Sequence, residues 1–127
     1  MKPVICIAGP TASGKSAYAV KLAEIVGGEI INADALQVYE DLQVLSARPN
    51  LSEMAGIPHH LFGHVSGKIR YSTGQWLREV EPIIIDCLAR DIAPIIVGGT
   101  GLYFRALLNG MADIPEVDSQ VLSLIHI

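Results

Sequence analysis

The most informative segment of the chain reads Val4-Ile5-Cys6-Ile7-Ala8, followed at once by Gly9-Pro10-Thr11-Ala12-Ser13-Gly14-Lys15-Ser16. An apolar run, the pattern G-x-x-x-x-G-K-S and the helix-forming stretch 17–26 match the strand, loop and helix of a phosphate-binding loop. The glycines let backbone N–H groups turn toward a phosphate, and the following helix adds the positive end of its dipole. The sequence therefore predicts binding of a di- or triphosphate.

The two polar residues that end this loop have separate expected roles. Lys15 can reach the outer phosphate as a point charge, and Ser16 offers a hydroxyl to Mg²⁺. A glycine-rich turn that bound nothing would leave Lys15 without a reason to be there. We expect the whole loop to bind phosphates, with Ser16 as the metal ligand: Gly9, Pro10, Thr11, Ala12, Ser13, Gly14, Lys15 and Ser16.

Composition bounds the class of protein. The chain has 127 residues, of which 50% are hydrophobic, so we expect one domain with a packed core. The uncharged stretch 92–104 is too short to span a bilayer, and the apolar run at residues 4–8 is too short for a signal peptide. These features predict a cytoplasmic protein that does not act at a membrane.

Charge and cysteine content argue against two kinds of site, a cysteine-based metal site and a basic surface for nucleic acid. Cys6 and Cys87 lack metal-ligand spacing, so both are expected to be buried, reduced thiols. The net charge of −4 gives no electrostatic footprint for nucleic acid.

Apolar runs alternate with helical patterns along the chain. We predict strands over 4–8, 29–32, 60–65 and 94–97, and helices over 16–26 and 102–108, with a short helical piece near Met54. The clearest helical pattern lies between the strands predicted over 60–65 and 94–97 and begins with a capping box of Ser72 and Gln75. Its apolar face consists of Trp76, Leu77, Val80, Ile83, Ile84, Cys87 and Leu88. This order predicts an α/β fold with a mostly parallel sheet, in three layers like other P-loop NTPases and incomplete.

The end of the chain looks different from the rest. After Pro115, the residues 116–127 show no cap and no turn chemistry. We therefore predict a phosphate-binding core over 1–115 and an irregular tail over 116–127, either truncated or of foreign origin.

Three features are expected to meet at the carboxyl edge of the sheet, where ligands bind in folds of this kind. They are the phosphate loop, Asp34 after the second strand, and the stretch 98–101 after the last. Asp34 is a candidate magnesium contact or general base, and the alternative is a solvated turn cap. Thr100 could hydrogen-bond a substrate or cap the following helix.

Other polar residues are weaker candidates for a functional site. The run Ile83-Ile84-Ile85-Asp86 imitates the magnesium-binding strand of many NTPases, but its isoleucines belong to the helical face, so we reject it. The three histidines His59, His60 and His64 lack a cysteine or carboxylate to complete a metal set and are expected to be half-buried or at the substrate edge. Arg48 is either a diphosphate contact or a surface charge.

Five segments together resemble the tRNA dimethylallyltransferase family in order and spacing over roughly residues 3–115. They are the phosphate loop, Asn32-Ala33-Asp34-Ala35-Leu36-Gln37-Val38-Tyr39, Ser46-Ala47-Arg48-Pro49, Pro58-His59-His60-Leu61 and Gly98-Gly99-Thr100-Gly101-Leu102-Tyr103-Phe104. The resemblance implies transfer of a dimethylallyl group from dimethylallyl diphosphate to N6 of the adenine 3′ of the tRNA anticodon, with release of diphosphate.

The resemblance also assigns roles. Asp34 matches the family's acid, Lys15 and a Ser16-bound Mg²⁺ would stabilise the leaving diphosphate, and Thr100 matches a threonine at the tRNA contact. Residues expected at the tRNA are Asp34, Ala35, Leu36, Gln37 and Thr100, of which Ala35 replaces the family's usual serine.

Family members are more than twice as long as this chain. The resemblance therefore implies that much of the tRNA-binding surface lies elsewhere, that these 127 residues alone are inactive, and that the full-length enzyme is a monomer. Two other readings stay open. A small-molecule kinase using ATP would need an arginine-rich lid, which the five scattered arginines do not supply, and a non-catalytic module would bind diphosphate without turnover.

Overall fold

A computed structural model describes residues 2–9, 14–34, 51–62, 72–98, 105–107 and 122–126. Their regular elements, in chain order, are β1 (Val4–Ala8), α1 (Lys15–Val26), β2 (Gly28–Asn32), α2 (Leu51–Met54), β3 (His59–His60), α3 (Thr73–Ala89), β4 (Ala93–Gly98) and β5 (Leu122–His126). The alternation of strands and helices confirms the predicted α/β class.

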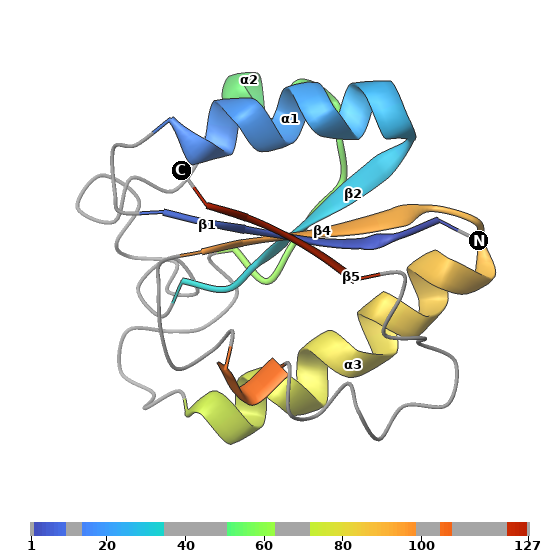
Figure 1. The fold of residues 1–127 in the computed structure, drawn as a ribbon. Helices are drawn as coiled ribbons and strands as arrows, with labels where there is room; N and C mark the ends of the chain where they lie inside the picture. Colours follow the sequence, from blue (N-terminus) through green and yellow to red (C-terminus); the bar gives the residue numbers. More distant parts are fainter. Residues whose placement is uncertain are drawn as a thin grey trace.

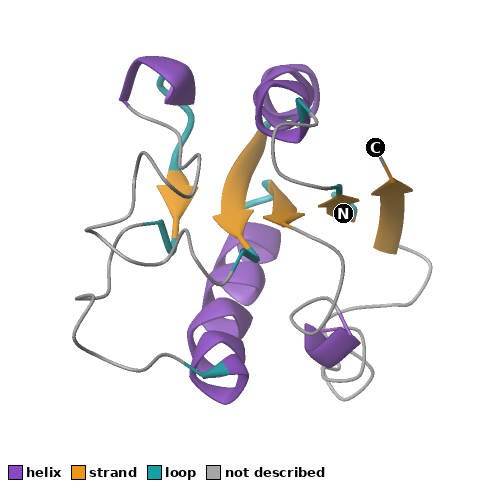
Figure 2. Ribbon diagram, turned by 90° about the vertical axis from the view of Figure 1, so that its left-hand side faces the viewer, coloured by secondary structure: helices purple, strands orange, loops and turns teal. Residues whose placement is uncertain are grey.

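The five strands form one sheet in the order β3-β2-β4-β1-β5, and every pairing is parallel (Figures 1 and 2). β4 lies between β1 and β2, with Gly98 opposite Ala8 and Val97 opposite Asn32. The carboxyl ends of β1, β4 and β2 therefore lie next to one another.

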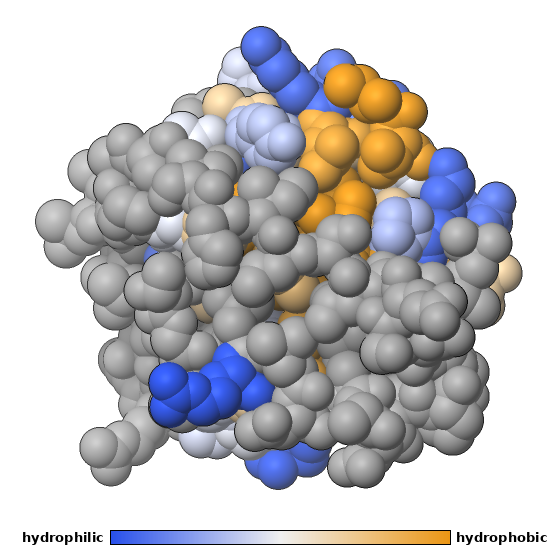
Figure 3. All heavy atoms as spheres, in the orientation of Figure 1, coloured by the Kyte–Doolittle hydropathy of each residue, from blue (hydrophilic) through white to orange (hydrophobic). Residues whose placement is uncertain are grey.

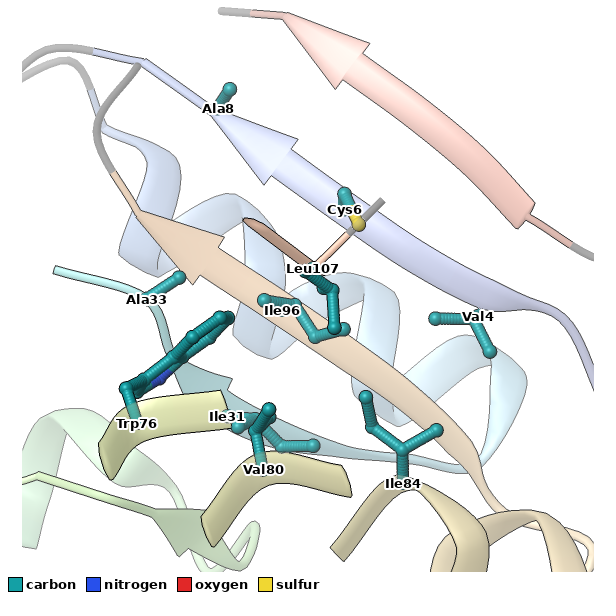
Figure 4. Close-up of a cluster of buried hydrophobic side chains, with 10 residues drawn as sticks. All are labelled: Val4, Cys6, Ala8, Ile31, Ala33, Trp76, Val80, Ile84, Ile96 and Leu107. Atoms are coloured by element: carbon teal, nitrogen blue, oxygen red, sulfur yellow. The ribbon is translucent and has the colours of Figure 1, made fainter. Parts of the chain in front are cut away.

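Helices cover both faces of the sheet, so the fold has three layers: α1 and α2 lie on one side and α3 on the other (Figures 1 and 2). Successive side chains of β1 point to opposite faces of the sheet, as the two-residue period of a strand requires. Ile5 and Ile7 pack with Ala19 and Ala23 of α1. Val4, Cys6 and Ala8 belong to the cluster that α3 completes (Figure 4).

The helix α3 follows its sequence pattern closely. Ser72 caps it by accepting from the Gln75 amide at 3.1 Å, and the Gln75 side chain accepts from the Ser72 amide at 2.9 Å. Trp76, Val80, Ile84 and Cys87 are all buried against the sheet. The capping box and the apolar face predicted from the sequence are thus confirmed.

Two predicted elements differ from the structure. The strand expected over 60–65 begins one residue earlier, as β3 (His59–His60), and Leu61 has a φ of 65°, which ends the extended backbone there; residues 63–65 lie outside the described ranges. The tail expected to be irregular contains β5, which pairs with the edge of β1 from Val4 to Ala8. Of the helix expected over 102–108, Arg105–Leu107 are described and helical.

The surface of the described residues carries few large apolar side chains. Tyr18, Ile25 and Ile85 are exposed, Ile25 by 80%. Figure 3 shows apolar side chains gathered over the C-terminal half of α1. No helix in the described ranges is both long enough and apolar enough to cross a bilayer.

Candidate active site

The candidate site lies where three strand ends converge. The Gly9 amide, just after β1, donates to the Gly98 carbonyl at 3.2 Å, and the Ala33 amide, just after β2, donates to the Val97 carbonyl at 2.8 Å. A Cβ on Gly98 would lie 2.5 Å from the Ala33 carbonyl oxygen, so only glycine allows this approach. The prediction that the carboxyl ends of β1, β2 and β4 lie next to one another is confirmed.

The start of α1 lies at the same edge of the sheet (Figure 1). Gly14 has a φ of 84°, in the left-handed region that favours glycine, and its carbonyl accepts the Tyr18 amide at 3.1 Å to begin the helix. Gly14, the N-cap residue, has no side chain with which to cap this helix end. The first amides of a helix have no partner within it, so the start of α1 is suited to bind an anion.

Lys15 and Ser16 occupy the first turn of α1. Lys15 is 6% exposed, and Ser16 is half-buried. A cation removed from water attracts an anion more strongly than it would at the surface, because the surrounding dielectric is lower. The buried position of Lys15 therefore suits the charge neutralisation expected of it.

Asp34 lies two residues beyond β2 and is half-buried. Its amide donates to Oδ1 of Asn32 at 2.8 Å, and its carbonyl accepts from Nδ2 of Asn32 at 2.9 Å. The backbone of Asp34 is therefore held on both sides by one buried side chain. This places a carboxylate at the same sheet edge as the start of α1.

Sequence reasoning missed Asn32 as a residue of the site. The available signal was an asparagine that ends a strand two residues before Asp34, the spacing at which asparagine side chains bond the backbone. Its third partner, the Leu61 carbonyl at 3.1 Å, is 29 residues away and could not be read from the sequence.

A second polar cluster lies at the other end of β2. Glu29, buried in the sheet, accepts from Nη1 of Arg90 at 2.9 Å and lies 2.8 Å from Nε2 of His60. The Arg90 side chain, by hydrogen bonding, lowers the pKa of Glu29 to about 2. Arg90 also pairs with Asp86 on the exposed side of α3 at 2.8 Å. This cluster joins β2, β3 and α3 but lies away from the carboxyl edge.

The structure agrees with the sequence analysis on the residues that were not assigned to the site. Asp86 lies on α3 and not at a strand end, and His59 and His60 are half-buried. Burial lowers the pKa of His59. Cys6 and Cys87 are buried free thiols, and burial raises their pKa values to about 12 and about 11.

Several predicted site residues lie outside the described ranges, so their roles stay predictions. These are Pro10, Thr11, Ala12, Ser13, Ala35, Leu36, Gln37 and Thr100, together with Arg48 and His64.

The expected Mg²⁺ needs oxygen donors at this edge. Within the described ranges, no group of three or more His, Cys, Asp or Glu side chains could enclose a metal ion. What the edge offers is the Ser16 hydroxyl and the Asp34 carboxylate. This set fits Mg²⁺, which commonly keeps several waters and takes its other ligands from substrate phosphates.

Comparison with known families gives two matches that together cover nearly the whole chain. The profile described as IPP transferase matches residues 37–125, and the one described as Isopentenyl transferase matches residues 2–62.

Curated relatives agree with each other. A tRNA dimethylallyltransferase of Hyphomonas neptunium is 55% identical over 121 residues, or 95% of this chain, and one of Rhizobium etli is 56% identical over 113 residues, or 89%. The chain spans 38% of the length of each.

Solved structures share the fold. The tRNA delta(2)-isopentenylpyrophosphate transferase of Staphylococcus epidermidis is 37% identical with a TM-score of 0.80, over 84% of this chain and 35% of that one. A eukaryotic dimethylallyltransferase acting on tRNA is 40% identical with a TM-score of 0.80, over 84% of this chain and 27% of that one.

Proposed function

Because this chain belongs to the IPP transferase family, we propose that the complete protein modifies tRNA by transferring a dimethylallyl group from dimethylallyl diphosphate to N6 of the adenine 3′ of the anticodon. The observation that carries the proposal is the meeting of Lys15, the start of α1 and Asp34 at one sheet edge. The names of the curated relatives, tRNA dimethylallyltransferases at about 55% identity, support the choice of substrates.

The bond changes follow from this arrangement. The adenine N6 attacks C1 of the dimethylallyl group, the C1–O bond breaks, and its electron pair leaves with the diphosphate. Negative charge therefore grows on the diphosphate oxygens. The amides at the start of α1 and the buried Lys15 ammonium stabilise that charge, since they are already in place before reaction.

The proton of the attacking amine goes to Asp34. An exocyclic adenine amine is a poor nucleophile, so its placement in line with the C1–O bond contributes as much as the base. We assign this placement to Ala35, Leu36, Gln37 and Thr100, which follow the strands that end at the site. The base must leave its stack to enter, which costs on the order of a few kcal/mol.

Mg²⁺, when bound, supplies further neutralisation of the diphosphate charge. Ser16, in the first turn of α1, is the residue that would hold it. Lys15 and the helix amides then bind the oxygens on the remaining sides of the diphosphate.

The chain spans 38% of its curated relatives, and its net charge is −4. A tRNA ligand needs positive charge, which we assign to the part of the protein outside these residues. We propose that the segment alone binds the diphosphate without transferring its prenyl group, and that the complete protein acts as a monomer in the cytoplasm.

The test is the reaction itself. The complete protein is incubated with dimethylallyl diphosphate, Mg²⁺ and tRNA, and the nucleosides are analysed by mass spectrometry. We expect N6-dimethylallyladenosine at the position 3′ of the anticodon. Its absence, with the diphosphate bound, would refute the transfer.

Asp34→Asn tests the assigned base. We expect the transfer rate to fall by at least about 100-fold while dimethylallyl diphosphate affinity stays close to that of the wild type. Asp91→Asn is the matched control: Asp91 is exposed at the end of α3 with a φ of 58°, which asparagine also tolerates. Equal rates for the two variants would remove Asp34 from the mechanism.

A further inference from the structure

Asn32, the last residue of β2, is fully buried and joins three parts of the chain. Its Oδ1 accepts the Asp34 amide at 2.8 Å. Its Nδ2 donates to the carbonyls of Asp34 at 2.9 Å and of Leu61 at 3.1 Å. Both amide protons and the amide oxygen are therefore in use.

These contacts fix which polar group the position requires. Two carbonyl oxygens need a donor, and one amide needs an acceptor, so only a neutral carboxamide satisfies all three. An aspartate of the same shape would keep the bond from the Asp34 amide but point a negative charge at two carbonyl oxygens. In a buried setting, unsatisfied or opposed polar groups are costly.

The backbone of Asn32 is held as well. The Trp76 Nε1 donates to the Asn32 carbonyl at 2.6 Å, and Trp76 is fully buried in the cluster between α3 and the sheet. Figure 4 shows the Trp76 ring lying beside Ala33 and Ile31, with its nitrogen toward β2. Asn32 is thus held from α3, while its side chain holds Asp34 and Leu61.

The position of Asn32 in the sheet explains why such a link is useful. The β2–β4 register ends at Asn32 opposite Val97, and the Ala33 amide makes one more bond to Val97. Asp34 lies one residue beyond. The Asn32 side chain therefore extends the order of the sheet to the residue that carries the carboxylate.

We propose that Asn32 is a positioning residue for Asp34, fixing the carboxylate where it can take the proton of the attacking amine. This inference rests on the proposed function. A group that accepts a proton during attack must be held to a fraction of an ångström, and a misplacement of about 1 Å can cost about 100-fold in rate. Positioning from a distance should lower kcat more than it alters substrate binding.

Two substitutions in the complete protein test this. Asn32→Ala removes all three side-chain bonds, and Asn32→Asp keeps the acceptor for the Asp34 amide while losing both donors. We expect each to lower kcat by about 10- to 100-fold with less than about a threefold change in KM for dimethylallyl diphosphate. If Asn32→Ala does not fold, Asn32→Asp decides the question.

Val80→Ala is the control for simple loss of stability. Val80 is fully buried in the same cluster as Trp76 but is not among the partners of Asn32 or Asp34 within the described residues. This variant should melt at a lower temperature and keep its kcat when assayed well below that temperature. A low kcat in Val80→Ala equal to that of the Asn32 variants would assign their effect to destabilisation and overturn the proposal.

The outcomes separate this inference from the proposed function. If the wild-type protein transfers no prenyl group to tRNA, the function fails. If the wild type is active and Asp34→Asn is not, but a folded Asn32 variant turns over at the wild-type rate, the positioning role alone is overturned. A selective fall in kcat in the folded Asn32 variant supports it.

Discussion

At the scale of single residues, the candidate site depends on where Lys15 and Asp34 are held. Lys15 is buried in the first turn of a helix that begins at Gly14 in a left-handed conformation, and Asp34 is bonded to the buried Asn32. The backbones that carry both charged groups are thus held in place. Such groups need little rearrangement when charge develops in a reaction.

Lys15→Ala should weaken binding and turnover together. In the proposed mechanism the ammonium binds the diphosphate both before and after the C1–O bond breaks, so its loss affects both states, and we expect at least about a tenfold loss in each. Calorimetry with dimethylallyl diphosphate and steady-state kinetics of the complete protein measure the two effects.

The matched control is Lys21→Ala, since Lys21 is exposed on the same helix. It removes the same charge from the molecule without touching the first turn of α1. Diphosphate affinities that are equal in the two variants would contradict the role of Lys15.

The sequence was sufficient to select Lys15 and Asp34 as candidate site residues, but not Asn32. Lys15 belongs to a motif whose spacing carries a mechanism, and Asp34 follows a predicted strand at the edge where ligands bind. Asn32 gains its role from the Leu61 carbonyl and from Trp76, which approach it only once the chain has folded. Short-range patterns cannot report contacts of that kind.

At the scale of elements, Glu29 couples β2 to β3 and to the end of α3 through His60 and Arg90. The hydrogen bond from Arg90 lowers the pKa of Glu29 from 4.5 to about 2 in the folded protein. A carboxylate with a lower pKa in the folded state stabilises the fold when it is ionised in both states. That contribution is complete above about pH 4.5 and is lost as the pH falls toward 2.

As the pH is lowered through that window, we therefore expect the free energy of unfolding to decrease more steeply for the wild type than for Glu29→Gln. At neutral pH the variant should be less stable by about 1 kcal/mol, since Arg90 and His60 lose a charged partner, and the exposure of Arg90 to solvent keeps the effect small. Urea unfolding at a series of pH values measures both effects.

Glu24→Gln serves as the control, because Glu24 is exposed on α1 and should leave the pH dependence unchanged. Parallel stability curves for the wild type and Glu29→Gln below about pH 4.5 would show that Glu29 does not carry the effect.

Helices were easier to predict than short strands, for a physical reason. α3 has its own capping box and one apolar face, so its sequence is sufficient to define it. β3 is two residues long and exists beside β2, and β5 exists beside β1, so each depends on a neighbour that is distant in the chain. The local sequence of these segments does not indicate which strand they pair with.

At the scale of the whole molecule, the sheet is covered by helices on both faces (Figure 1), and we propose that its carboxyl edge binds the ligand. The sequence predicted the α/β class but not the strand order. The residues of β1, β2 and β4 are all buried, and each strand has an apolar run, so the pattern alone cannot say that β4 lies in the middle. The match to the IPP transferase family supports the chemistry that we propose for this architecture.

The most direct test of that chemistry compares two ligands for the phosphate loop. The protein is titrated in a calorimeter with dimethylallyl diphosphate and, separately, with ATP, each with Mg²⁺. We predict clear preference for dimethylallyl diphosphate, and loss of that binding in Lys15→Ala. Preference for ATP would contradict prenyl transfer and favour a kinase that uses the same loop.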